Sequence, residues 1–124
     1  GYAGVALKFI ETAQSGTNGT MIMCIPNDGS IDGLRNDDVV EITCDVDKNG
    51  CTPHRIGKVD ERNLELIRRV KNYERLSSKA IRERSRSDAI QALTLHPLVN
   101  SYSIAVKLVD EFIEHNKNYC GGWK

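Results

Sequence analysis

The sequence lacks the features that would assign it to a membrane or to a polyanionic partner. No apolar run approaches the roughly 20 residues that a membrane-spanning helix needs. The chain carries 17 basic and 17 acidic side chains, so no overall electric field attracts nucleic acid or a membrane surface. Its 124 residues and 40% hydrophobic content are typical of a globular protein. We therefore expect one soluble domain over residues 1–124.

Motifs for metal, nucleotide and nucleophilic chemistry are also missing. The four cysteines are Cys24, Cys44, Cys51 and Cys120, and they include no Cys-x-x-Cys pair of the kind found in zinc sites. Cys51 and His54 are close in sequence, but on an extended strand they would point to opposite faces. No Walker A, Gly-x-Gly-x-x-Gly or Gly-x-Ser-x-Gly motif is present, so no nucleotide site or serine nucleophile is indicated. We expect four reduced thiols in the cytoplasm.

Hydrophobic spacing predicts a helix, then strands, in the first half of the chain. Residues 5–13 place apolar side chains on one face of a helix. The run TMIMCIP, at residues 20–26, is almost continuously apolar and predicts a buried strand. Residues 40–46 alternate between apolar and polar, which is typical of a strand with one solvated face. The Asn49-Gly50 pair is a strong hairpin signal, so we expect the following segment to return antiparallel.

Three helices are predicted in the second half. The first begins at Asp60, a suitable N-cap, and a shorter one covers residues 88–95 before His96-Pro97 ends it. The last has its apolar stripe over residues 104–113, and the tail after it is expected to fray. This order of elements predicts an α+β fold, in which a small antiparallel sheet with a hairpin packs against several helices.

A basic stretch in the first of these helices allows two interpretations. Nine basic and three acidic residues lie between Arg62 and Arg86, which suits a free-standing helical module that binds nucleic acid. Tyr73 is the only aromatic side chain within the stretch, and it lies on the apolar stripe. A charged helix surface that faces solvent or another subunit is therefore favoured, and nucleic-acid binding is kept as the alternative.

Four separated segments of the chain together resemble a known enzyme family. They are GYAGVALKFIE, IPNDGSIDGLRNDDVVEI, VKNYERLSSKAI and ALTLHPLVNSY, in that order. In this order they resemble the C-terminal domain of the NAD-dependent glycoside hydrolase family 4, and most of all the 6-phospho-β-glucosidases. The similarity extends over nearly the whole chain. The resemblance implies a fold like the C-terminal domain of lactate and malate dehydrogenases, preceded in the parent enzyme by a Rossmann domain that is absent here.

The resemblance also implies an unusual hydrolytic reaction. NAD⁺ would oxidise the sugar at C3 and thereby acidify the C2 proton, and a divalent metal, usually Mn²⁺, would stabilise the enediolate. A base would take the C2 proton, the aglycone would leave from C1, and water addition and reduction would complete the cycle. The substrate would be a phosphorylated disaccharide or aryl glucoside, and the parent a cytoplasmic homo-oligomer. The isolated domain is expected to be inactive, because it contains no NAD or metal site.

Site residues follow from the resemblance at two places. Tyr2 occupies the position of the catalytic base of the family, and its phenol, with an ordinary pKa near 10, would need a lowered pKa to act at neutral pH. The family's Asn-rich loop, beside the substrate cleft, corresponds to Asn27, Asp28 and Gly29. Cys24 stands where many relatives carry Asn. No residue of this chain is expected to bind NAD or metal.

The substrate stays open within the same family. The mechanism begins at C2 and C3 rather than at the anomeric bond, so it tolerates either anomer. A 6-phospho-α-glucoside, an α-galactoside or a glucuronide is therefore the alternative to a 6-phospho-β-glucoside.

Overall fold

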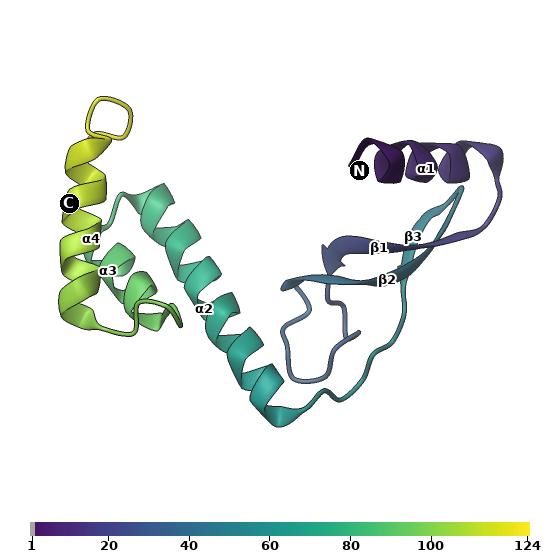
Figure 1. Ribbon diagram of the computed structural model, residues 1–124, viewed down its shortest axis with the longest axis horizontal. Helices are drawn as coiled ribbons and strands as arrows, with labels where there is room; N and C mark the ends of the chain where they lie inside the picture. Colours follow the sequence, from purple (N-terminus) through teal and green to yellow (C-terminus); the bar gives the residue numbers. More distant parts are fainter. Residues whose placement is uncertain (1) are drawn as a thin grey trace. The chain divides into compact units, whose positions relative to one another are not determined.

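The computed structural model describes residues 2–124, except for the side chain of Tyr2. Four helices and three strands follow one another within these residues, which confirms the α+β class (Figure 1). The chain divides into two compact units, one ending at Val59 and the next beginning at Asp60. The elements of the first unit are α1 (Tyr2–Ser15), β1 (Gly19–Pro26), β2 (Val39–Asp47) and β3 (Gly50–Pro53). Those of the second are α2 (Glu61–Glu83), α3 (Arg86–Leu95) and α4 (Tyr102–His115).

The first unit is built on a three-stranded antiparallel sheet in the order β1-β2-β3. The predicted hairpin joins β2 to β3, with Val46 opposite Cys51. Asp47 shapes its turn, because the Asp47 Oδ1 atom accepts a bond of 2.7 Å from the Asn49 backbone N–H. Gly50 follows at a φ of 127°, a conformation that residues with a side chain rarely adopt.

The core of this unit lies on one face of β2, as the alternation predicts. Val40, Ile42, Cys44 and Val46 are all buried, and the last two have no exposed surface. Ile31, from the loop between β1 and β2, joins this cluster. The loop is therefore anchored to the sheet by an apolar side chain.

The prediction for β1 was wrong in one respect, because this strand is not buried on both faces. Met21 is buried, whereas 64% of Ile22 is exposed. β1 lies at the edge of the sheet and pairs with β2 alone. Its apolar residues suit a strand covered on both sides, but within residues 2–124 only one side of it is covered.

The second unit is a bundle of three helices with capped N-termini, of which the sequence predicted the cap of α2 at Asp60. The Asp60 side chain accepts from the Arg62 N–H at the start of α2, and Ser85 and Ser101 do the same for α3 and α4. Ile90, Ala105 and Val109 form the buried cluster between α3 and α4. No helix in the described part of the chain is long and apolar enough to cross a membrane.

The C-terminal tail is held in place, contrary to the predicted fraying. Lys124 accepts a backbone bond of 2.8 Å from Arg86 and donates one of 2.9 Å to Arg84. This places Trp123 in the lining of an apolar groove of about 280 Å³, together with Tyr73 and Phe112. The composition of the tail did not predict the backbone bonds of Lys124 to Arg84 and Arg86, because Gly-Gly segments are usually mobile at chain ends.

Candidate functional site

The loop between β1 and β2 begins with a buried asparagine. Asn27 has no exposed surface. Its Oδ1 atom accepts a bond of 2.8 Å from the Ile31 N–H, and its Nδ2 atom donates one of 3.2 Å to the Ile31 carbonyl. Both polar atoms of the Asn27 amide are therefore hydrogen-bonded within the loop. The structure gives Asn27 the role of closing the base of the loop.

The next two residues form an exposed tight turn. The Ser30 N–H donates to the Asn27 carbonyl over 2.7 Å, and the residues between them have positive φ, 40° at Asp28 and 79° at Gly29. This pattern is that of a type I′ turn, which Asp and Gly tolerate best. Asp28 is exposed, so of the three predicted loop residues it is the one whose side chain faces solvent.

The far side of the turn is joined to the segment after β3. The Ser30 carbonyl accepts bonds of 2.9 Å from the backbone N–H groups of both Ile56 and Gly57, and the Asp32 N–H donates to the Gly57 carbonyl over 2.9 Å. Ile31 and Gly57 form an isolated parallel bridge. These bonds make the loop a preformed structure rather than a free connection.

Arg55 adds a side-chain clamp to the same loop. Its Nη1 atom donates to the Gly29 carbonyl over 3.1 Å, and its Nη2 atom donates to Asp32 Oδ1 over 2.9 Å. Sequence reasoning missed Arg55, because its partners lie 26 and 23 residues away and no local spacing relates them.

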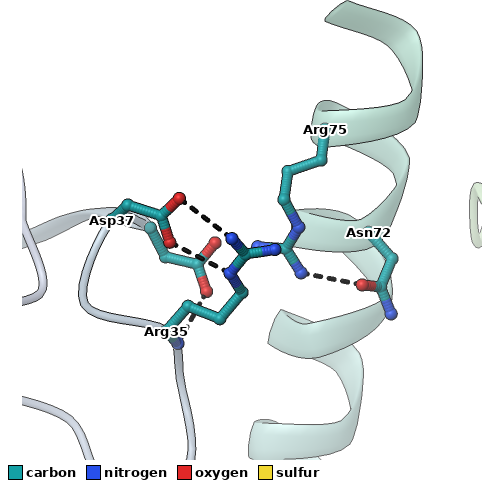
Figure 2. Close-up of polar contacts among 5 residues, drawn as sticks. Arg35, Asp37, Asn72 and Arg75 are labelled. Carbon is teal, nitrogen blue, oxygen red and sulfur yellow. Dashed lines mark hydrogen bonds and ion pairs between the residues drawn. The ribbon is translucent and has the colours of Figure 1, made fainter. Parts of the chain in front are cut away.

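The end of the loop is closed by Asp38, which is buried. The Asp38 Oδ2 atom accepts from the Arg35 N–H over 3.0 Å, and the Asp38 carbonyl accepts from the Asn27 N–H over 2.7 Å. In the same part of the loop, the Arg35 guanidinium donates two hydrogen bonds to the Asp37 carboxylate, of 3.0 and 3.1 Å (Figure 2). The loop therefore has a closed base and an exposed, charged rim.

The proposed base, Tyr2, is the first residue of α1. Its side chain lies outside the described residues, so its role stays a prediction. Asn27, Asp28 and Gly29 are likewise predicted substrate residues, now with a defined geometry.

Other titratable groups in the first unit are engaged on the sheet. The hydrogen bond from His54, 2.9 Å from Nε2 to Asp45 Oδ1, lowers the pKa of the Asp45 carboxyl, and a bond from Thr20 acts in the same direction. Burial raises the pKa of the Cys44 thiol, which makes it a poor nucleophile at neutral pH. All four cysteines are free. The described residues include no group of three His, Cys, Asp or Glu side chains that could hold a metal ion.

The basic stretch in the helical unit is mostly occupied by local partners. Lys79 pairs with Asp88 over 2.8 Å, and Arg86 makes bonds of 2.6 and 2.8 Å to Asp110. Arg75 donates to Asn72 over 2.7 Å (Figure 2). The pairs of Lys79 and Arg86 join neighbouring helices of the bundle, which favours the structural interpretation over a phosphate-binding face.

Comparison with known proteins identifies similar sequences. The model of the family 4 glycosyl hydrolase C-terminal domain matches residues 2–99. The chain is 36% identical over 118 residues to maltose-6'-phosphate glucosidase MalH of Clostridium acetobutylicum, covering 95% of this chain and 27% of that protein. It is 35% identical over 118 residues to 6-phospho-beta-glucosidase BglT of Thermotoga maritima, covering 95% of this chain and 28% of that protein. The chain thus spans just over a quarter of these relatives.

Solved structures give the same result for the fold. A 6-phospho-alpha-glucosidase from gut microorganisms, in complex with NAD and Mn²⁺, matches with a TM-score of 0.93 at 28% identity, over 99% of this chain and 28% of that one. The 6-phospho-beta glucosidase of Thermotoga maritima, with NAD and glucose-6-phosphate, matches with a TM-score of 0.88 at 34% identity, over 96% of this chain and 29% of that one.

Proposed function

The chain belongs to the family 4 glycosyl hydrolases, as their C-terminal domain, and we propose that it is part of an enzyme that hydrolyses 6-phosphoglucosides. The observation that carries this proposal is the family match over residues 2–99. Relatives named for both 6-phospho-β- and 6-phospho-α-glucosides support the substrate class. Since the chain spans 27% of the first relative, the catalytic cycle needs protein beyond this sequence, and we expect the isolated chain to be inactive.

For the anomer, we propose a 6-phospho-β-glucoside, with the α-anomer as the alternative. The β proposal is supported by the 34% identity to the Thermotoga maritima structure. The α alternative is supported by the 36% identity to a maltose-6'-phosphate glucosidase. A test must therefore include both anomers.

We place the NAD and metal sites in the remainder of the parent protein. NAD supplies oxidation and later reduction of the sugar when it is bound in such enzymes. Residues 2–124 include no group of three His, Cys, Asp or Glu side chains that could hold a metal ion, so we assign no metal-dependent step to this chain. The contributions proposed for its own residues are a base, Tyr2, and a loop that meets the substrate through Asp28 and Gly29, with the buried Asn27 holding the base of that loop.

Tyr2 is proposed to accept the proton from the sugar carbon next to the oxidised one. A phenol has an ordinary pKa near 10, so at neutral pH it would need a positively charged environment to act as a base. Tyr2→Phe keeps the ring and removes only the oxygen that would take the proton. The substitution therefore tests the chemical role separately from packing.

The experiment is hydrolysis of aryl 6-phospho-β- and 6-phospho-α-glucosides by the intact parent protein, with and without NAD⁺ and Mn²⁺. The wild type is compared with Tyr2→Phe and with Tyr119→Phe, a control at a tyrosine that is 89% exposed. We expect turnover that requires both additions, that is faster for the β-anomer, and that falls at least about a hundredfold in Tyr2→Phe alone. Turnover that survives Tyr2→Phe would return Tyr2 to a packing role. No turnover of either anomer would contradict the proposed function.

We also propose that the remainder of the parent protein covers α1 and the exposed side of β1. α1 has only two charged side chains, Lys8 and Glu11. Leu7 is 59% exposed and Ile22 64% exposed, and an open groove between the two elements is lined by Val5 and other apolar side chains. A helix that is apolar on most of its surface is typical of a protein interior.

A further inference from the structure

We propose that Arg55 is a positioning residue for substrate binding, because it fixes the exposed tip of the loop from Asn27 to Asp32. The inference rests on the proposed function, since it takes this loop to meet a 6-phosphoglucoside. Arg55 would not touch the reacting atoms. It would act through the residues that it holds.

The two bonds of Arg55 connect the two sides of the tip. One reaches the carbonyl of Gly29, inside the tight turn, and the other reaches the carboxylate of Asp32, after it. The flat guanidinium suits such a double contact, because its donors point in fixed directions. Removing it breaks the link between the Gly29 carbonyl and the Asp32 carboxylate, while the backbone bonds at the base of the loop remain.

The base of the loop does not depend on Arg55. The Asn27 amide bonds to Ile31, and Ser30 bonds to the backbone of Ile56 and Gly57. The side chain of Arg55 is 71% exposed, so its loss leaves no cavity in the core. The loop can therefore keep its fold while the tip loses its fixed shape.

The positive charge of Arg55 would also favour binding of a phosphorylated sugar. The tip carries two carboxylates, Asp28 and Asp32, and a 6-phosphoglucoside brings a further negative group. The Arg55 cation neutralises Asp32 at 2.9 Å. Without it, an uncompensated carboxylate would repel the substrate phosphate, and this repulsion would weaken as salt increases.

The test uses Arg55→Gln in the intact parent protein, with Lys58→Gln as the matched control. Lys58 is an exposed cation three residues along the same segment, so the control removes the same charge without touching the clamp. We expect KM for the preferred aryl 6-phosphoglucoside to rise about threefold to tenfold in Arg55→Gln, with kcat within about twofold of the wild type. The rise in KM should be larger at low salt. Adding Asp32→Asn to Arg55→Gln should lower KM part of the way toward the wild-type value, because it removes the uncompensated carboxylate.

A second measurement follows the clamp itself. Amide hydrogen exchange should be faster in Arg55→Gln than in Lys58→Gln at Ser30, whose N–H closes the tight turn at the tip. It should be the same in both variants at Gly57, whose N–H bond belongs to the base of the loop. Unchanged exchange at Ser30 would overturn the clamp. An unchanged KM in an active enzyme, or a parallel loss of kcat and thermal stability, would overturn the positioning role. A wild type without activity on any 6-phosphoglucoside would instead overturn the proposed function, and the substrate part of this inference with it.

Discussion

At the scale of single residues, the loop between β1 and β2 separates structural from exposed polar groups. Asn27 is fully buried with both ends of its amide bonded, whereas Asp28 beside it faces solvent. We therefore expect Asn27 to contribute more than Asp28 to the free energy of folding. Substitution of Asn27 should be felt first as a loss of stability, and substitution of Asp28 as a change in what the loop can bind.

Asn27→Ala should lower the free energy of unfolding of the chain by about 2 kcal/mol, because it leaves the Ile31 N–H and carbonyl buried without their partner. Urea denaturation measures this change. Asn36→Ala is the control, since the Asn36 side chain is exposed on the same loop, and it should change the free energy by less than about 0.5 kcal/mol. Equal losses from the two substitutions would show that burial of Asn27 does not determine its contribution.

The sequence was sufficient to place a loop at Asn27, Asp28 and Gly29 but not to assign the roles within it. Asn, Asp and Gly predict turns because each tolerates positive φ, and the structure has that conformation at Asp28 and Gly29. Burial of Asn27 depends on Ile31 reaching the core, which composition does not reveal. The role of Arg55 depends on a contact between segments more than 20 residues apart.

At the scale of secondary structure, hydrogen bonds at the helix ends determine where α2, α3 and α4 begin. Ser85 lies at the junction of α2 and α3: its backbone N–H bonds to Ala80, and its Oγ atom accepts from the Asp88 N–H over 3.2 Å. α2 ends at Glu83, and its C-cap, Arg84, is left-handed with a φ of 52°. The change of direction is therefore concentrated in two adjacent residues.

Ser85→Ala should lower the free energy of unfolding by about 1 kcal/mol, because the cap of α3 is lost. Ser78→Ala, at an exposed position inside α2, should leave stability unchanged or slightly higher, since alanine favours helix. Thermal unfolding followed by circular dichroism compares the two variants. A larger loss at position 78 than at position 85 would contradict the assignment of the cap.

The ion pair between Arg86 of α3 and Asp110 of α4 predicts an acid-dependent contribution to stability. The hydrogen bonds from Arg86 lower the pKa of the Asp110 carboxyl in the folded state. A lowered folded pKa adds stability above the unfolded pKa, near 3.9, and this stability is lost as the pH falls through the folded value. Asp110→Asn should therefore lower the melting temperature at pH 7, and the difference from the wild type should shrink below about pH 4. Glu111→Gln, at the next position, removes the same charge without touching the ion pair and is the control for the melting temperature at pH 7.

Element positions were predicted well wherever a local signal has a single structural meaning. The alternation in β2, the Asn49-Gly50 hairpin and the N-cap at Asp60 are all confirmed. The prediction that β1 is buried was wrong. An apolar run shows that a strand suits burial on both faces, but the described residues cover only one face of β1. The tail was wrong because one pair of backbone bonds, at Lys124, outweighs the freedom of its glycines.

At the scale of the whole molecule, the apolar surface of α1 and β1 is the main feature that the chain leaves exposed in its first unit. The chain spans about 28% of the solved relatives, so most of each related enzyme lies outside the matched region. An apolar surface exposed to water is unfavourable for an isolated protein. The exposure of α1 and β1 is explained if the rest of the parent protein covers them. The same substitution should then behave differently in the two contexts.

Leu7→Glu should change the stability of the isolated chain by less than about 0.5 kcal/mol, because Leu7 is 59% exposed there. In the intact parent, it should lower the melting temperature by several degrees, since a charge would be forced into an apolar contact. Glu11→Gln on the same helix is the control and should be silent in both. An equal effect of Leu7→Glu in the chain and in the parent would exclude α1 from the domain contact.

The anchored C-terminal tail provides an optical probe. Trp123 is the only tryptophan in the sequence, and it is held in the groove of the helical unit beside Tyr73 and Phe112. Its fluorescence therefore reports on the unit that begins at Asp60, while the sheet unit contributes no tryptophan emission. Comparison of this emission with the strand signal in circular dichroism during unfolding would show directly whether the two units unfold together or one after the other.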